Sequence, residues 1–85
     1  MKYIETHQIP KGGISPDIFN LPCVNCAYKH KTKGVEYSLI VSMLHDYTSV
    51  SYAYPTDWLC LDEFGAWHVI NDGVYKNRAK LMNNH

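Results

Sequence analysis

Hydrophobic and polar residues alternate over the longest stretch between residues 35 and 44. Every second position in this stretch is apolar, namely Val35, Tyr37, Leu39, Val41 and Met43. A period of two is typical of a half-buried strand. A helix is the alternative, since helical spacing is satisfied by Leu39, Ile40, Met43 and Leu44. The β-branched and tyrosine content favours the strand, which we predict over residues 35–44.

Three further strands are expected to follow it. After a turn at residues 45–47, a second alternating stretch covers residues 50–54 and contains Val50, Tyr52 and Tyr54. Two short apolar runs, 58–61 and 66–70, then flank a loop that contains Gly65, which can take the left-handed conformation of a type I turn with a bulge. The pattern therefore predicts a four-stranded antiparallel meander over residues 35–70.

The two ends of the chain carry weaker patterns. Residues 2–9 alternate loosely up to Pro10 and predict an edge strand. Ser15, Pro16 and Asp17 resemble a helix cap, its first position and its first-turn acid, and Pro22 ends that helix within two turns. Residues 72–82 predict a C-terminal helix that covers a sheet face with one stripe, formed by Tyr75, Ala79 and Met82. We expect an α+β, mostly β fold: a small antiparallel β-meander with a short C-terminal helix.

Composition limits the possibilities further. With 85 residues, the chain (1–85) is expected to form a single small domain, and 46% hydrophobic residues argue against disorder. Eight basic residues balance eight acidic ones, so no net field attracts a nucleic acid. The chain contains no apolar run of the length that crosses a membrane and no signal-peptide core near Met1, so we expect no membrane partner and a cytoplasmic location.

Cysteine and histidine spacing gives the sharpest chemical candidate. Cys23 and Cys26 are separated by two residues, and His30 follows, a spacing that allows two thiolates to reach one zinc ion. A closed zinc site needs two more ligands, and the second close-spaced pair is missing; the best remaining donors are Cys60 and His68. We therefore expect no cofactor and ordinary or redox-active thiols. Zinc at Cys23 and Cys26, in a module that binds nucleic acid or protein, is the alternative.

Aromatic side chains are the second candidate. Tyr52, Tyr54, Trp58 and Trp67 lie on predicted strands, where rings on one face can bind a protein or a small ligand; core packing is the competing interpretation. A basic cluster can hold a phosphate or a single nucleic-acid strand, or can be a solvated loop; it comprises Lys29, His30, Lys31 and Lys33.

Acid, base and nucleophile residue types also occur, but in no recognisable catalytic motif. They are the His45 and Asp46 pair, and His68 with Cys60. Adjacent residues on a strand point their side chains apart, so the pair does not converge on one site. We therefore predict that the chain is not an enzyme.

Residues 55–75 resemble a segment that closes many small phage and prophage proteins, "PGDW/PGDY … G-E-x-Y … P-D-x-F". The spacing of Pro55, Asp57 and Trp58 is kept, with Thr56 in place of the usual glycine. The aromatic residue after the turn is Trp67, and Asn71 stands in place of the usual proline before the final aspartate. The resemblance implies a hairpin and a small binding protein that inhibits a host protein of anti-phage defence or sequesters a small ligand in the host cytoplasm. Exposed edge strands also make a homo-oligomer an expectation.

Overall fold

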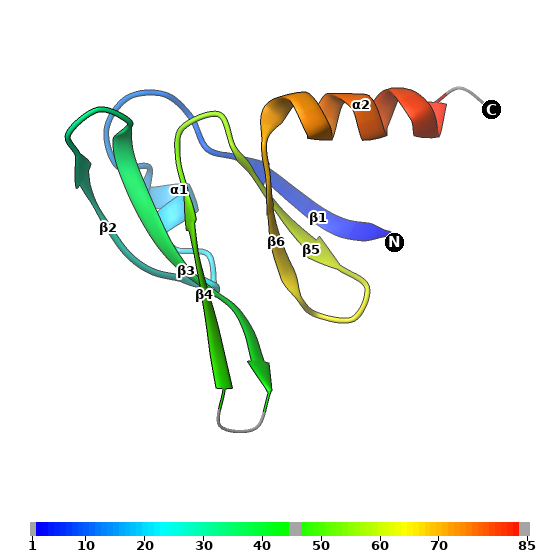
Figure 1. The fold of residues 1–85 in the computed structure, drawn as a ribbon, viewed down its shortest axis with the longest axis horizontal. Helices are drawn as coiled ribbons and strands as arrows, with labels where there is room; N and C mark the ends of the chain where they lie inside the picture. Colours follow the sequence, from blue (N-terminus) through cyan, green and yellow to red (C-terminus); the bar gives the residue numbers. More distant parts are fainter. Residues whose placement is uncertain (1, 45–46, 84–85) are drawn as a thin grey trace.

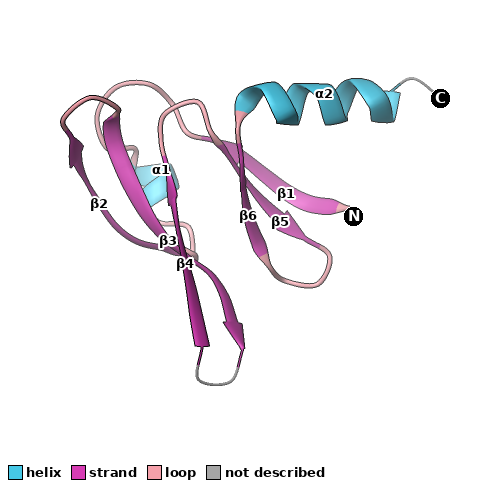
Figure 2. Ribbon diagram, in the orientation of Figure 1, coloured by secondary structure: helices cyan, strands magenta, loops and turns pink. Residues whose placement is uncertain are grey.

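Six strands form two antiparallel sheets of three strands each (Figures 1 and 2). The computed structural model describes the backbone of residues 2–44 and 47–83, and the side chains of residues 2–40 and 50–78. One sheet has the order β1-β5-β6, from β1 (Tyr3–Gln8), β5 (Trp58–Asp62) and β6 (Trp67–Ile70). The other has the order β2-β3-β4, from β2 (Val24–His30), β3 (Gly34–Leu44) and β4 (Tyr47–Ala53). With the helices α1 (Pro16–Phe19) and α2 (Asp72–Asn83), this confirms a mostly β chain that ends in a helix.

Strand β3 confirms the interpretation of residues 35–44 as extended chain. Val35, Tyr37 and Leu39 are buried on the inner face, and the pairing with β4 shifts by one residue between Ile40 and Ser42. Such a bulge bends a strand and increases its twist. The predicted turn at residues 45–47 includes residues 45 and 46, which lie outside the described residues.

The hairpin of β5 and β6 is also confirmed. Gly65 has φ +87°, so the loop uses the left-handed conformation for which glycine is suited. The buried carboxylate of Asp62 accepts hydrogen bonds from the N–H groups of Phe64 (2.8 Å) and Ala66 (2.9 Å), and it also contacts the ring of His68 (2.7 Å). These bonds fix the turn and hold the pKa of Asp62 below its ordinary value, the His68 contact contributing most.

The prediction of one continuous meander was wrong at the connection between β4 and β5. Within the described residues β4 pairs with β3 and not with β5, whereas β5 pairs with β1. The turn at residues 55–57 causes the change of sheet: Thr56 has φ +78°, and its N–H donates to the carbonyl of Ile9 (2.8 Å). The N–H of Ile9 in turn donates to the carbonyl of Asp57 (2.9 Å), so the chain leaves β4 toward the N-terminal strand.

Strand β2 was missed because its residues lack the alternation of a half-buried strand. Its inner face carries Ala27 and the exposed Lys29. Cys26 and Tyr28 lie on the outer face, paired with Ser38 and Glu36 of β3. The strand forms an edge of its sheet, where charged residues are common.

The core lies between the two sheets and draws side chains from both. Ser15 caps α1 as predicted, since its hydroxyl accepts from the Ile18 N–H (3.5 Å) and Pro16 occupies the first turn. The N–H of Ser15 donates to the hydroxyl of the fully buried Tyr37 (2.8 Å), which ties α1 to the centre of the sheet. The buried cluster comprises Ile9, Ile18, Cys23, Val35, Tyr37, Leu39, Ala53 and Leu59.

Helix α2 is anchored to the sheet of β1, β5 and β6 by its first two turns. Tyr75 stacks on Trp58 with ring centroids 3.8 Å apart and planes 9° from parallel. Asp72 accepts from the Trp58 indole N–H (2.9 Å), and Arg78 donates to the hydroxyl of Tyr3 (2.5 Å). The predicted stripe thus contacts the sheet through Tyr75; the side chains of its other two members lie outside those described. Neither helix in the described residues has the length and apolar character that a membrane crossing requires.

Candidate functional site

The outer face of the β2-β3-β4 sheet carries a group of tyrosines around one carboxylate. Strand register places Tyr28 beside Glu36 and Tyr52 beside Ser38, and alternation along β4 puts Val50 on the same side as Tyr52. Tyr54 directly follows β4 and reaches this face through its hydrogen bond to Glu36. We call this surface the tyrosine face and define it by Tyr28, Glu36, Val50, Tyr52 and Tyr54.

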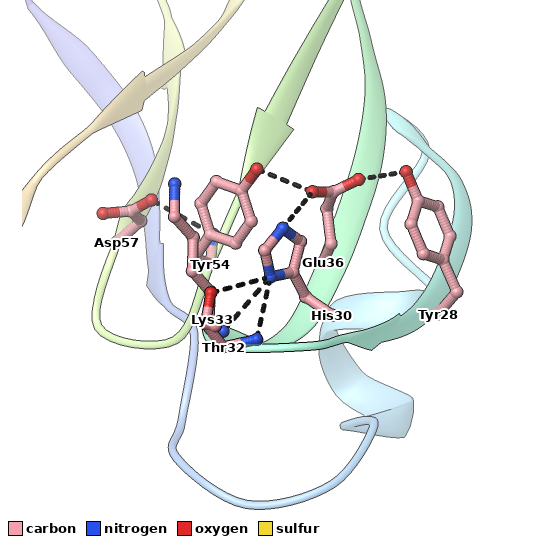
Figure 3. Close-up of polar contacts among 7 residues, drawn as sticks. All are labelled: Tyr28, His30, Thr32, Lys33, Glu36, Tyr54 and Asp57. Carbon is pink, nitrogen blue, oxygen red and sulfur yellow. Dashed lines mark hydrogen bonds and ion pairs between the residues drawn. The ribbon is translucent and has the colours of Figure 1, made fainter.

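Glu36 organises the tyrosine face. Its side chain is nearly buried between two rings, with 8% of the residue exposed. The hydroxyl of Tyr28 donates to one carboxylate oxygen and that of Tyr54 donates to the other (2.6 Å), as Figure 3 shows. These hydrogen bonds stabilise the ionised carboxylate and lower the pKa of Glu36. The same bonds raise the pKa of Tyr28 to about 12 and raise the pKa of Tyr54.

Tyr54 is held from two further sides by basic residues. The ring of His30 meets it edge to face, with centroids 5.7 Å apart, and the ammonium of Lys33 lies 4.4 Å from its centroid. The Nδ1 atom of His30 accepts from the N–H groups of Thr32 and Lys33 (both 3.2 Å), which assigns the ring proton to Nε2, 3.9 Å from Glu36 (Figure 3). These contacts hold the phenol ring of Tyr54 in one orientation, with the ammonium group of Lys33 over the ring.

The remaining members of the tyrosine face reach solvent. Tyr52 is 50% exposed, Val50 53% and Tyr28 44%, large fractions for side chains of this size. The rings of Tyr28 and Tyr54 are fixed by their hydrogen bonds to Glu36, so the sheet presents aromatic surface that is already ordered.

The four aromatic residues chosen from the sequence do not share one surface. Tyr52 and Tyr54 lie on the tyrosine face, whereas Trp58 and Trp67 belong to the other sheet and point to its opposite faces. Trp58 anchors α2 through Tyr75, and Trp67 packs against the core. Sequence reasoning missed Tyr28 and Glu36. They flank the basic cluster at residues 29–33, and a hairpin predicted there would have indicated that the two residues pair.

The cysteines are distributed over different environments. Cys23 is buried in the core, and burial raises its pKa to about 11, whereas Cys26 lies half-buried on the outer face. Cys60 is fully buried, which also raises its pKa, so both buried groups remain thiols at neutral pH. The described residues contain no group of three or more His, Cys, Asp or Glu side chains placed to hold a metal ion.

The residues considered for catalysis are not part of the tyrosine face among the described residues. His68 is bound to Asp62 at the β5-β6 turn. His45 and Asp46 lie outside the described residues. Among the described residues, His68 of β6 thus contacts the carboxylate that fixes the β5-β6 turn.

Comparison of the chain with protein-family models, with curated proteins and with solved structures finds no match. The similarity of residues 55–75 to phage proteins stays a prediction. Any functional assignment therefore depends on the side chains of this chain itself.

Proposed function

We propose that the chain is a non-enzymatic binding protein that contacts a partner protein through the tyrosine face. The observation that supports this proposal most directly is the exposure of the Tyr28 and Tyr52 rings on one sheet face, on either side of β3, together with the ordered Tyr54 and Glu36. Tyrosine is enriched at protein interfaces because its ring contributes apolar contact area and its hydroxyl contributes a hydrogen bond.

Side chains that are already ordered in the free protein favour binding at such a surface. A side chain that is immobilised during association costs about 0.5–1.5 kcal/mol of conformational entropy. The hydroxyls of Tyr28 and Tyr54 are already bonded to Glu36, and Tyr54 is also enclosed by His30 and Lys33. Part of the entropic cost is therefore met by folding, before a partner arrives.

The sequence resemblance suggests the origin of the partner. Small phage proteins of this kind imply a host protein, such as a component of anti-phage defence, which the chain would inhibit in the host cytoplasm. The backbone at residues 55–57 supports the resemblance: Thr56 has φ +78° where the resembled proteins carry glycine, the residue that this conformation favours. The proposal requires the tyrosine face to be the contact surface and no turnover of a substrate.

Affinity capture from host lysate with matched variants tests this proposal. Tyr52→Ala removes an exposed ring from the tyrosine face, and Phe64→Ala removes one from the β5-β6 turn, where Phe64 is 82% exposed. We expect a stoichiometric partner to be retained by the wild type and by Phe64→Ala, and to be lost with Tyr52→Ala. Retention by all three proteins, or by none, contradicts the proposal. Circular dichroism confirms that each variant is folded.

A further inference from the structure

A second surface of interest is a cleft at the end of the β2-β3 hairpin. It lies between that hairpin and the loop that follows β1, and it has a volume of about 580 Å³. Volumes of about 300–1,000 Å³ are typical of small-molecule sites. Gly34 and Pro55 adjoin in its lining, because a Cβ added at Gly34 would be in van der Waals contact with the ring of Pro55 (3.4 Å). The cleft is distinct from the tyrosine face, although His30 borders both.

Positive charge is concentrated at this cleft. Two of the eight basic residues of the chain line it, whereas Lys33 lies over the ring of Tyr54. Lys11 and Lys29 line the cleft from opposite sides, and among the described residues that line it none is acidic. The carboxylate of Glu36 on the same hairpin belongs to the tyrosine face, where it accepts from two tyrosines and lies 3.9 Å from Nε2 of His30. Within the described lining, the two lysines of this cleft are thus not accompanied by an acidic residue.

The loop after β1 adds backbone donors. Gly12 has φ +106°, and open space surrounds the Cβ positions of Gly12 and Gly13. Neither N–H donates to an acceptor in the described part of the chain. Consecutive N–H groups in a turn with positive φ are a common way to bind an anion. Two ammonium groups and two free amides are a donor set suited to a dianionic phosphate.

Apart from His30, the rest of the lining is apolar. The ring of Pro55 and the methylene stems of the lysines contribute hydrocarbon, whereas Val35 is 4% exposed and adds little. A bare phosphate ion fills little of the volume and leaves these groups without contact. We propose that the cleft binds a small organic phosphate, with the phosphate held by Lys11, Lys29 and the Gly12–Gly13 amides and the apolar body against Pro55 and the lysine stems.

Amide chemical-shift titration of the whole chain tests this inference, with phenyl phosphate as the probe and inorganic phosphate and phenol as its two halves. We expect saturable shifts at the amides of Gly12 and Gly13, with phenyl phosphate binding about tenfold more tightly than inorganic phosphate, a factor that corresponds to about 1.4 kcal/mol. Lys11→Gln and Lys29→Gln should each weaken binding about tenfold. Equal affinity for the two phosphates, or tighter binding of phenol, overturns the assignment of an organic phosphate.

Lys2→Gln is the matched control, since Lys2 lies at the other end of β1, where its carbonyl bonds to Glu63. This variant removes the same charge from the chain and should keep the affinity of the wild type. Equal weakening by Lys2→Gln and Lys11→Gln, or the absence of saturable shifts at Gly12 and Gly13 in the folded wild type, refutes the site. The result is independent of the partner protein, because no member of the tyrosine face is changed.

Discussion

Replacing Thr56 with glycine should stabilise the protein. Thr56 has φ +78°, a conformation in which the Cβ of an L-residue approaches the backbone, and its β-branched side chain makes the contact worse. Its backbone bonds do not depend on the side chain: the N–H donates to Ile9, and the carbonyl accepts from the side chain of Gln8 (3.1 Å). Thr56→Gly therefore removes strain and keeps the connection between the two sheets.

Two opposing effects set the magnitude. A non-glycine residue in the left-handed region costs about 1–2 kcal/mol, and we take the upper part of this range for threonine. Glycine raises the conformational entropy of the unfolded chain and so costs about 0.4–1 kcal/mol. The expected gain in the free energy of unfolding is about 1 kcal/mol, which raises Tm by about 4–8 °C in a domain of this size.

Urea unfolding followed by circular dichroism measures the change, with Thr32→Gly as the matched control. Thr32 is exposed in the β2-β3 turn and is not among the described residues with positive φ, so the same substitution should destabilise by about 0.4–1 kcal/mol. The reverse change, Gly65→Ala at φ +87°, meets no atom within 4 Å and should destabilise by about 1 kcal/mol through the backbone alone. If Thr56→Gly destabilises as much as Thr32→Gly does, the strain argument is wrong.

Three further predictions concern the core, the helix and the carboxylate of the tyrosine face. Leu59→Ala, at a core position with 1% exposure, should lower the free energy of unfolding by about 2–5 kcal/mol in urea titration; a loss below about 1 kcal/mol would show that the two sheets do not share this core. Tyr75→Ala removes the stack on Trp58 and should lower the helical signal in far-ultraviolet circular dichroism, whereas an unchanged spectrum would mean that α2 is held otherwise. The pKa of Glu36 is lowered from 4.5 in the folded state, so its contribution to stability is present above pH 4.5 and is lost as the pH falls through the lower folded-state value. Glu36→Gln should therefore make Tm less dependent on pH between neutral and acidic conditions. A pH profile of Tm that the substitution leaves unaltered would contradict the hydrogen bonding described.

Local signals in the sequence were sufficient for the elements whose residues determine their own structure. Gly65 and the apolar runs beside it predict the β5-β6 hairpin, and Ser15 with Pro16 predicts the start of α1. The inner face of β3 was likewise evident from alternation. For the hairpin and the helix start the deciding interactions lie within a few residues along the chain, whereas for β3 the alternation itself marks the face that the core buries.

Pairing between distant segments was not accessible in this way. The turn at Thr56 sends the chain to β1 instead of back along β4, and no periodicity records that choice. Strand β2 shows no clear alternation of apolar and polar residues, because both of its faces are partly polar. On its outer face Tyr28 bonds to Glu36, and its inner face ends in the exposed Lys29 at the edge of the sheet. The candidate site therefore could be predicted only in part: Tyr52 and Tyr54 came from their strand, whereas Glu36 required the register of three strands.

The two sheets differ in how their strands are drawn from the chain. Residues 24–53 supply β2, β3 and β4 without interruption, whereas residues 3–8 must meet residues 58–62 to complete the other sheet. Contacts between near neighbours form faster than contacts that close a long loop. We expect the sheet with the tyrosine face to assemble early, and substitutions in β1 to accelerate unfolding more than they slow folding.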